Sequence, residues 1–521
     1  HVPGIEWSTG NLGQGLSAGV GAALARRATG GDWHVYVAMS DAEQNKGQVG
    51  EARRLAAKYR LCDLTVVVDL NMAQISGHTP EVMPVDVAAG FAADGWGVIE
   101  CDGHDTAALY DALRRARADA ERPYAVLAHT KIGHGVSFME DDPAYHGRAL
   151  TEDEYVRAMA ELGQDPAWLE RARARRAQPP TTPAAVAPPA VCARHVGVPR
   201  TYKKPTDCRS AWGNALADIA EADAATPMLV FDCDLMASVK TGAFARLRPE
   251  AFIECGVGEH NTAVAAAAAS VTGVLSFWAD FGVFGLDEVY NQQRLADINN
   301  ASLKLALTHC GLDVGEDGRT HQCIDYIGAL RSMYGWRVIV PADPNQSDRA
   351  VRVAATMPGC IAIVMGRSPL RPILRLDGTP AFAGDYAFRL GAIDVVREGD
   401  APVALLATGT LAGAAVRAAD LLRAEGVALT TALTATPLEL DDAVMGELAA
   451  TGTIVTVEDH NVDSGLGMSV AAWVAARGLP VRVVMLGVRA YASSGAPADL
   501  FAAAGLDETG IAASVRAALG S

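Results

Sequence analysis

Short apolar runs and longer helix-forming stretches alternate along the whole chain of 521 residues. The runs are rich in Val, Ile and Leu, as in parallel strands that are buried on both faces. The stretches between them are rich in Ala, Leu and Arg, which favour helices. Strands that alternate with helices predict an α/β fold class, with doubly wound, mainly parallel sheets.

Three consecutive blocks show this alternation, and we expect them to be domains at residues 1–175, 206–375 and 385–521. The predicted strands are 35–39, 64–70, 97–100 and 125–129 in the first block, 228–231, 303–308, 337–340 and 361–364 in the second, and 403–407, 453–457 and 481–485 in the third. Residues 176–205 are predicted to be an extended linker, because prolines interrupt them at Pro179, Pro180, Pro183, Pro188, Pro189, Pro199 and Pro205.

The composition excludes several classes of protein. Half of the residues (50%) are hydrophobic and 20% are charged, as in soluble globular proteins. A net charge of −17 argues against nucleic acid or an anionic membrane as a partner. The 9 cysteines are scattered without a Cys-x-x-Cys pair, which favours the reducing cytoplasm over a disulfide framework or a zinc site. The Ala-rich residues 263–274 are interrupted by Ser270, Thr272 and Gly273, so we expect a packed helix and turn there.

Two polar side chains follow neighbouring predicted strands. Asp41 comes at the end of the first apolar run and Asn71 directly after the second. Ligands of open α/β sheets bind outside the carboxyl ends of the strands, so both side chains should face one crevice. A carboxylate and an amide oxygen suit Mg²⁺ or Ca²⁺, with diphosphate oxygens as further ligands. Asp also caps loops after strands in many α/β proteins, and the spacing alone leaves both interpretations open.

Motifs along the chain resemble those of transketolases. Ser40-Asp41-Ala42-Glu43 with Asn71 is similar to their Gly-Asp-Gly … Asn thiamine-diphosphate motif. Further matches, in the family's order, are Thr9-Gly10-Asn11-Leu12-Gly13-Gln14-Gly15, Tyr145-His146-Gly147, Gly256-Val257-Gly258-Glu259, Gly315-Glu316-Asp317-Gly318-Arg319-Thr320-His321-Gln322 and Gly366-Arg367. The resemblance implies three domains in this order: a diphosphate-binding domain, a pyrimidine-binding domain and a C-terminal domain. The chain is similar to the compact, two-gene type of transketolase, with both halves on one chain.

The resemblance also implies which residues act on the cofactor. Glu259 would be the catalytic acid that bonds to N1′ of the aminopyrimidine, so that the 4′-nitrogen can take the C2 proton. From the sequence alone, a Glu that starts a helix and is favoured by the macrodipole is the commoner case, and the preceding Gly256-Val257-Gly258 with the family's order favours the catalytic role. The remaining cofactor contacts would come from Gly10 and Leu12 at the rings, Ala42 and His146 at the diphosphate, Ile75 behind the bent cofactor, Asp234 near the thiazolium, and Phe281 and Phe284 at the pyrimidine. Asp41, Asn71 and the carbonyl of Ala73 would bind the metal.

The substrate residues are implied in the same way. Arg209, Ser238, His309 and Arg367 match the groups that hold a sugar phosphate, and such groups suit a phosphate dianion. Asp317 would contact the C2 hydroxyl of an aldose, and His321, with His309, would act on the donor ketose. An isolated Arg or His in a loop is more often solvated or ion-paired. The family's plan further implies a homodimer with active sites at the subunit interface.

Some positions depart from the family pattern. Ser40 and Ala42 replace the two glycines of the metal motif, and Lys46 stands where the family has a Glu. The chain starts at His1, close to the Thr9 loop, so we expect a preceding segment to be missing.

Three functions follow from these observations. The first is the transfer of a two-carbon ketol unit between sugar phosphates. The second is a decarboxylating ligase of the 1-deoxyxylulose-phosphate synthase type, which the matches at His309 and Thr320-His321-Gln322 disfavour. The third is a degenerate paralogue that binds or regulates a partner, as the changes at Ser40, Ala42 and Lys46 suggest.

Overall fold

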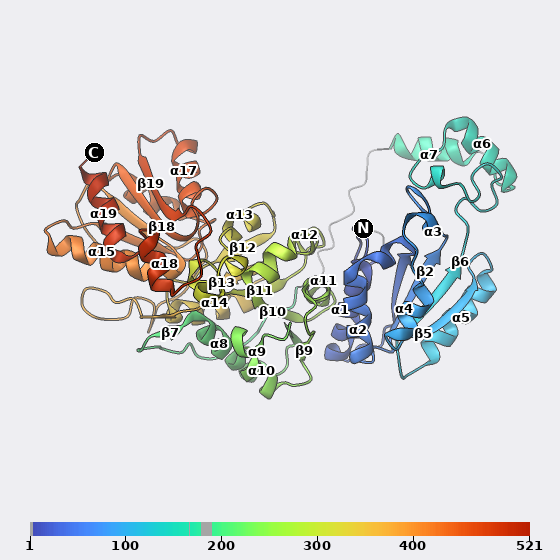
Figure 1. Ribbon diagram of the computed structural model, residues 1–521, viewed down its shortest axis with the longest axis horizontal. Helices are drawn as coiled ribbons and strands as arrows, with labels where there is room; N and C mark the ends of the chain where they lie inside the picture. The colour runs from blue at the N-terminus through green and yellow to red at the C-terminus, as the bar shows by residue number, and fades with distance from the viewer. Residues whose placement is uncertain (1–3, 166, 179–189, 521) are drawn as a thin grey trace. The chain divides into compact units, whose positions relative to one another are not determined.

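The computed structural model describes residues 4–165, 167–178 and 190–520. The chain divides into two compact units, His1–Pro189 and Ala190–Ser521 (Figure 1). No helix within these described ranges is long and apolar enough to cross a lipid bilayer.

The first unit is built on a parallel sheet of four strands in the order β1-β2-β6-β5. The strands are β1 (Val35–Ser40), β2 (Leu64–Leu70), β5 (Gly97–Asp102) and β6 (Tyr124–His129), and a hairpin of β3 (Ala73–Gln74) and β4 (Gly77–His78) follows β2. The helices are α1 (Gly15–Thr29), α2 (Gly47–Lys58), α3 (Thr79–Val82), α4 (Val87–Ala93), α5 (Thr106–Ala118), α6 (Glu152–Glu161) and α7 (Trp168–Arg176), with short turns η1 (Ala42–Asn45) and η2 (Pro143–Tyr145).

Glycine sets how closely α1 approaches this sheet. A Cβ at Gly19 would lie 2.4 Å from Val37 of β1, so only glycine lets the helix pack this close to the sheet.

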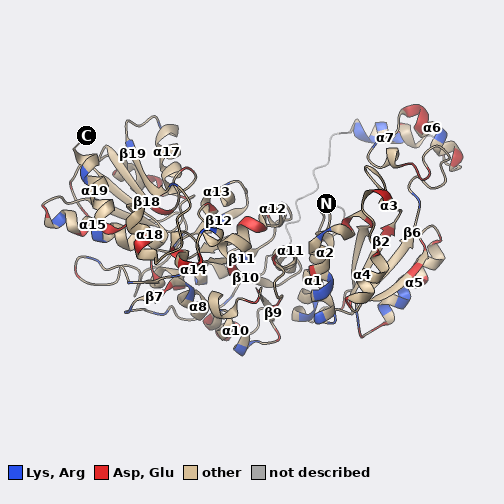
Figure 2. Ribbon diagram, viewed as in Figure 1, with Lys and Arg blue, Asp and Glu red and all other residues tan. Residues whose placement is uncertain are grey.

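At the end of the unit, an ion pair joins two helices. α6 begins with acidic residues and α7 ends with basic ones (Figure 2), and Arg173 of α7 forms an ion pair with Glu152 of α6.

The second unit begins with a parallel sheet of six strands in the order β12-β13-β11-β10-β8-β9. Its strands are β8 (Met228–Asp232), β9 (Phe252–Glu254), β10 (Leu275–Phe281), β11 (Leu303–Thr308), β12 (Trp336–Ile339) and β13 (Cys360–Val364), and β7 (Thr206–Asp207) pairs with β14 (Pro369–Leu370). The helices are α8 (Cys208–Ala222), α9 (Met236–Val239), α10 (Gly242–Leu247), α11 (Glu259–Val271), α12 (Tyr290–Ile298), α13 (Tyr326–Arg331) and α14 (Pro344–Ala355), with η3 (Val283–Glu288), η4 (Leu312–Asp317) and η5 (Arg319–His321) between them.

A further sheet of five strands, in the order β15-β17-β16-β18-β19, completes this unit. Its strands are β15 (Ile393–Arg397), β16 (Ala404–Ala407), β17 (Thr430–Thr434), β18 (Thr453–Asn461) and β19 (Arg482–Val488). Among the described residues of this sheet, only the edge strand β15 runs antiparallel to its neighbour. The helices are α15 (Ala412–Ala424), α16 (Asp442–Ala449), α17 (Leu466–Ala476), α18 (Pro497–Ala503) and α19 (Glu508–Leu519), with η6 (Gly409–Leu411).

Alternate residues of β16 enter two separate cores. Leu405 packs with α15 and α19 on one face, whereas Leu406 packs with α16 and α17 on the other. This alternation is what a doubly wound sheet requires, since each strand is covered by helices on both faces.

All the predicted strands have counterparts in the structure, within one to four residues at their ends. The predictions missed β9, β10, β15 and β17 of the three large sheets, and the two-residue strands β3, β4, β7 and β14. In β10 the buried residues Ser276 and Asp280 interrupt the apolar pattern, and β9 has only 3 residues. The helix and turn expected at 263–274 are present as α11, which ends at Val271 before Gly273.

The predicted linker is only partly covered by the described residues. Residues 179–189 lie outside them, and α7 reaches Arg176 at the start of the predicted range. Residues 190–205 contain neither helix nor strand and are held against α14, where Tyr202 N–H donates to Asn345 (2.8 Å) and Arg200 N–H donates to Asp348 (3.1 Å). An extended linker over the whole of 176–205 stays a prediction.

Candidate active site

Asp41 and Asn71 lie at the same edge of the first sheet. β1 and β2 are parallel neighbours with Ser40 opposite Asp69, so the residues that follow them leave the sheet at nearly the same level. Asp41 is fully buried, and its Oδ2 accepts a hydrogen bond from the Thr79 hydroxyl (2.8 Å). Within the described residues its Oδ1 is buried without a hydrogen-bond donor. A buried carboxylate oxygen in this position is costly unless a cation or another donor satisfies it.

The other candidate metal ligands have the right chemistry. The Asn71 amide oxygen accepts from the Ala73 N–H (2.9 Å) and keeps a second lone pair, while Asn71 Nδ2 donates to Asp69 (3.0 Å). Ala73 is buried in β3. Although Asp41 stands at the start of η1, its side chain makes no capping bond. Loop capping therefore does not explain this aspartate, and the set fits a hard divalent cation.

Glu43 joins two loops of this edge, and sequence reasoning gave it no role. Its carboxylate is buried and accepts from the N–H of Gly13 (2.7 Å) and the N–H of Ser40 (2.7 Å). The Gly13 loop and the Asp41 loop are thus fixed to each other by one side chain. A Cβ at Gly13, where φ is +83°, would also meet the side chain of Lys46 at 2.6 Å. The only sequence signal was that Glu43 falls within the metal motif.

The other predicted cofactor residues of this unit are exposed. Ile75, at the tip of the β3–β4 hairpin, is 79% exposed and Leu12 is 55% exposed. Gly10 and His146 are exposed in loops, and Ala42 is half-buried at the start of η1. The exposed apolar side chains of Ile75 and Leu12 are available to pack against an apolar group of a ligand.

In the second unit, Glu259 opens α11 and is half-buried. A carboxylate oxygen of Glu259, a carboxylate oxygen of Asp280 and the sulfur of Cys233 all lie within 4.8 Å of one another. Asp280 belongs to β10, and Cys233 directly follows β8. These neighbours are not those of an ordinary helix-starting glutamate on a surface.

An aromatic wall stands at the carboxyl ends of β10 and β11, formed by Phe281, Phe284, His309 and His321. The ring centroids of Phe281 and His309 are 3.8 Å apart, and those of Phe281 and Phe284 are 6.2 Å apart with nearly parallel planes. His321 stands edge-on to Phe284 at 5.4 Å. Gly282 makes this arrangement possible, since a Cβ there would lie 2.4 Å from the sulfur of Cys310. The structure thus brings together four of the predicted residues from three segments.

Arg209 connects the predicted phosphate residues. Its guanidinium donates to His309 Nε2 (3.1 Å), to the carbonyl of Ser238 (3.0 Å) and to the carbonyl of Arg367 (2.8 Å). Burial is the main reason that the pKa of Arg209 is lowered. Because these segments are far apart in the sequence, Arg209 gathers them at one place in the tertiary structure.

His309 is an acceptor in this cluster. Burial, together with the charges of Arg209 and Arg367, lowers the pKa of His309 to about 3, so the imidazole is neutral at pH 7. Its Nε2 receives the Arg209 N–H, and we therefore assign the proton to Nδ1, which lies 2.9 Å from the Thr308 hydroxyl. Lys240, which sequence reasoning missed, also acts on His309 as a positive charge.

Arg367 is held by acidic and backbone partners. It donates to Glu316 (2.8 Å) and to the carbonyl of Val314 (3.0 Å), and Asp317 lies 3.9 Å away. Its loop is fixed by the buried Asp313, whose Oδ2 accepts from the N–H of Arg367 (2.6 Å) and of Ser368 (2.7 Å). Asp234, in contrast, is exposed after β8 with φ +63°, and its N–H donates to Glu254 (3.0 Å).

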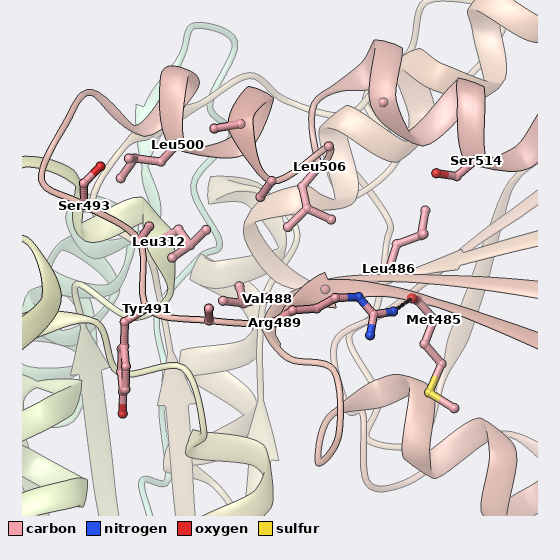
Figure 3. A pocket seen from close by; sticks show the side chains of 17 residues that line it. Leu312, Met485, Leu486, Val488, Arg489, Tyr491, Ser493, Leu500, Leu506 and Ser514 are labelled. Atoms are coloured by element: carbon pink, nitrogen blue, oxygen red, sulfur yellow. Dashed lines mark hydrogen bonds between the residues drawn. The ribbon is translucent and has the colours of Figure 1, made fainter.

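The last domain contributes backbone to the His321 loop. Gln322 donates to the carbonyl of Ala492 (3.3 Å) and accepts from its N–H (2.9 Å). The same strand-to-helix connection lines a separate cavity of about 490 Å³ next to Leu312. Figure 3 shows Arg489 in this cavity, where it donates to the carbonyl of Met485 (3.2 Å). The predicted site residues do not line this cavity.

Comparisons with known proteins agree with these features. The family models of the transketolase thiamine diphosphate binding domain, pyrimidine binding domain and C-terminal domain match residues 1–171, 204–372 and 391–511. Transketolase of Rattus norvegicus is 30% identical over 520 residues, which cover 98% of this chain and 80% of the rat protein. Transketolase-like protein 2 of Mus musculus is 28% identical over 521 residues, covering 98% of this chain and 80% of its own length.

A solved structure gives the same fold. Transketolase from Campylobacter jejuni superposes with a TM-score of 0.82 at 23% sequence identity, covering 99% of this chain and 83% of that chain. The chain belongs to the transketolase family, and its first domain is of the family's thiamine-diphosphate-binding kind. The resemblance in the motifs and the predicted α/β fold of three domains are confirmed.

Proposed function

We propose that this chain is an active transketolase, which transfers a two-carbon ketol unit from a ketose phosphate to an aldose phosphate. The observation that carries the proposal is the cluster of Arg209, His309 and Arg367 beside the aromatic wall. Two guanidiniums suit a phosphate dianion, which accepts charge-assisted hydrogen bonds from both of them, and the neutral imidazole of His309 lies beside them. The Ser238 hydroxyl would add a further donor from α9.

Thiamine diphosphate, when bound, supplies a nucleophilic carbon that can hold the two-carbon unit. Asp41, Asn71 and the Ala73 carbonyl would bind Mg²⁺ or Ca²⁺ beside its diphosphate, and the unsatisfied Oδ1 of Asp41 supports this assignment. The Ala42 N–H and His146 would bind the diphosphate oxygens. Gly10, Leu12, Ile75, Asp234, Phe281 and Phe284 would contact the rings.

Glu259 would hold a proton at N1′ of the aminopyrimidine. Its half-buried position at the start of α11 suits this role, since a carboxyl group out of water exchanges a proton with a ring nitrogen more readily than a solvated one. Asp317 and His321 would orient the sugar hydroxyl groups, and Asp317 already lies close to the guanidinium of Arg367.

The family's plan places the diphosphate-binding domain of one subunit against the pyrimidine-binding domain of another. We therefore propose a homodimer with the active sites at the subunit interface. We also propose that the protein works in the cytoplasm, because the scattered cysteines form no disulfide in the described part of the chain.

The test is an assay of the purified protein reconstituted with thiamine diphosphate and Mg²⁺. A panel of ketose phosphates is offered as donors and aldose phosphates as acceptors, with Glu259→Gln as the inactive control. We expect a lengthened aldose product without release of CO₂. Release of CO₂ from pyruvate would instead support a decarboxylating ligase. Absence of product together with normal cofactor binding would support a degenerate paralogue.

A further inference from the structure

Glu259 has an unusual acidic neighbour in Asp280. Asp280 is completely buried near the end of β10, and its Oδ1 accepts the N–H of Phe281 (2.7 Å). Its Oδ2 is buried and has no hydrogen-bond partner among the described residues. A carboxylate oxygen of Asp280 lies within 4.8 Å of a carboxylate oxygen of Glu259. One unsatisfied oxygen thus lies beside the carboxylate of the proposed catalytic acid.

The charged groups that act most strongly on Asp280 are acidic. From β8 and its end it faces Asp232 and Cys233, and from α11 it faces Glu259. From β11 the Thr308 hydroxyl reaches only the carbonyl of Asp280 (3.2 Å). From η3 the backbone of Gly285 packs so closely that a Cβ there would lie 3.1 Å from the Asp280 Cβ.

The charges around Asp280 therefore favour a proton on the pair. Burial raises the pKa of Asp280 well above its usual value, and the carboxylate of Glu259 raises it further. Burial likewise keeps the thiol of Cys233 protonated by raising its pKa, and its S–H donates to the Thr262 hydroxyl (3.4 Å). Two carboxylates at this distance in a dry site do not both ionise near neutral pH.

We propose that Asp280 and Glu259 share one proton, and that Asp280 is a positioning residue that keeps this proton beside Glu259. In the proposed function, this shared proton would pass from Asp280 through Glu259 to N1′ of the bound cofactor. The proton then returns by the same path, so the pair ends each cycle with one proton and no other bond changes. This last step rests on the proposed function, whereas the shared proton does not.

The first experiment needs no cofactor. Infrared titration of the cofactor-free protein, taken as the difference from the Glu259→Gln variant, isolates the Glu259 carboxyl. Asp280→Asn keeps the volume and the acceptor for the Phe281 N–H but removes the second acid. We expect the Glu259 titration to move by at least about one pH unit in Asp280→Asn. The control Asp232→Asn, at another buried acid on the neighbouring strand β8, should move it much less.

An unchanged Glu259 titration in Asp280→Asn overturns the proposal. If Asp280→Asn does not fold, the wild-type titration decides alone. A single step at an ordinary glutamate pH overturns the shared proton, and two separated steps support it.

A second measurement separates this inference from the proposed function. The pH profile of C2 proton exchange in the bound cofactor should shift in Asp280→Asn in parallel with the Glu259 titration. Wild-type exchange in Glu259→Gln would remove the proposed function while leaving the shared proton intact.

A metal ion in place of the proton is the competing outcome. Chelator-treated protein is titrated with Zn²⁺ alone, because Cys, Glu and Asp are also ligand types for this ion. We expect no binding that depends on Asp280. Binding of one Zn²⁺ that is lost in both Asp280→Asn and Cys233→Ser would overturn the proposal.

Discussion

At the scale of residues, two buried aspartates differ in what their carboxylate groups are suited to bind. Asp41 and Asp280 are both fully buried, and each has one carboxylate oxygen without a donor in the described chain. Their surroundings differ. Asp41 lies next to amide and carbonyl oxygens that a cation also uses, whereas Asp280 lies next to a second acid. The first is suited to a metal and the second to a proton.

Replacement of Asp41 tests the metal site. Asp41→Ala should abolish Mg²⁺-dependent binding of thiamine diphosphate while the domain still folds, because a charged ligand is lost from a site of few ligands. Calorimetric titration measures the affinity. Asp102→Ala is the matched control, since Asp102 ends β5 of the same sheet but is exposed, and its affinity should stay that of the wild type. Equal cofactor affinity in Asp41→Ala and wild type would contradict the assignment.

Replacement of Arg367 or Arg209 tests the phosphate site. A charge-assisted contact is worth about 1.5–3 kcal/mol, so Arg367→Ala should raise KM for a phosphorylated sugar by roughly ten- to a hundredfold with a smaller change in kcat. Arg209→Ala should have the larger effect, because Arg209 also holds the carbonyls of Ser238 and Arg367. Steady-state kinetics with matched phosphorylated and unphosphorylated sugars measure this.

The exposed Arg371, four positions beyond Arg367, provides the control. Arg371→Ala should leave KM unchanged. A wild-type enzyme that shows no preference for the phosphorylated sugar would mean that the cluster is structural.

At the scale of elements, the end of β18 fixes the loop that carries Asp317. Asp459 in β18 is buried and accepts from the N–H of Leu312 (2.8 Å) and of Asp313 (3.2 Å), the first residues of η4. Asp313 in turn holds the Arg367 loop. One strand of the last domain therefore positions two loops that carry proposed substrate residues in the domain before it.

Asp459 also makes stability depend on pH. Burial raises its pKa to about 8, against about 3.9 in an unfolded chain, so the folded state binds its proton more tightly. The stability that this gives is fully present below pH 4 and is lost as the pH rises through about 8. Asp459→Asn should therefore reduce the fall of the unfolding midpoint between pH 5 and pH 8.5 by a few degrees, at roughly 2–4 °C per kcal/mol.

Thermal unfolding at both pH values measures this difference. Asp463, exposed in the turn after β18, is the control, and Asp463→Asn should keep the pH dependence of the wild type. The same fall in wild type and Asp459→Asn would show that another group is responsible.

At the scale of the whole molecule, the proposed homodimer divides each active site between subunits. Asp41 and Glu259 of one chain would then serve different sites. Mixing the inactive variants Asp41→Ala and Glu259→Gln should restore one site with both residues intact per heterodimer. We expect activity to return to roughly a quarter of the wild-type level, because about half of the randomly mixed dimers would be mixed and each would have one of two sites intact.

Subunit exchange must be verified by mass spectrometry of the mixture before activity is measured. Each variant taken alone through the same exchange procedure serves as the control and should stay inactive. Verified exchange without recovery of activity would count against the shared site.

The sequence by itself determined the fold class, the family and most of the strands that carry the motifs. These features are local, since a buried strand needs a continuous apolar run and a motif needs only its neighbours. The strand β10 was missed because Asp280 and Ser276 lie within its buried run, which periodicity treats as an interruption. Asp280, one of the two polar residues that interrupt the pattern of β10, is also the residue that lies beside Glu259.

Only the tertiary structure decided how the site residues interact. Glu43 joins two loops, Arg209 gathers three segments, and His309 accepts a hydrogen bond as a neutral ring. Each of these depends on which strand ends meet at a sheet edge and how much water remains there, and no local pattern contains that information. The sequence therefore identified the chemical groups, whereas burial and packing decided their charge and their partners.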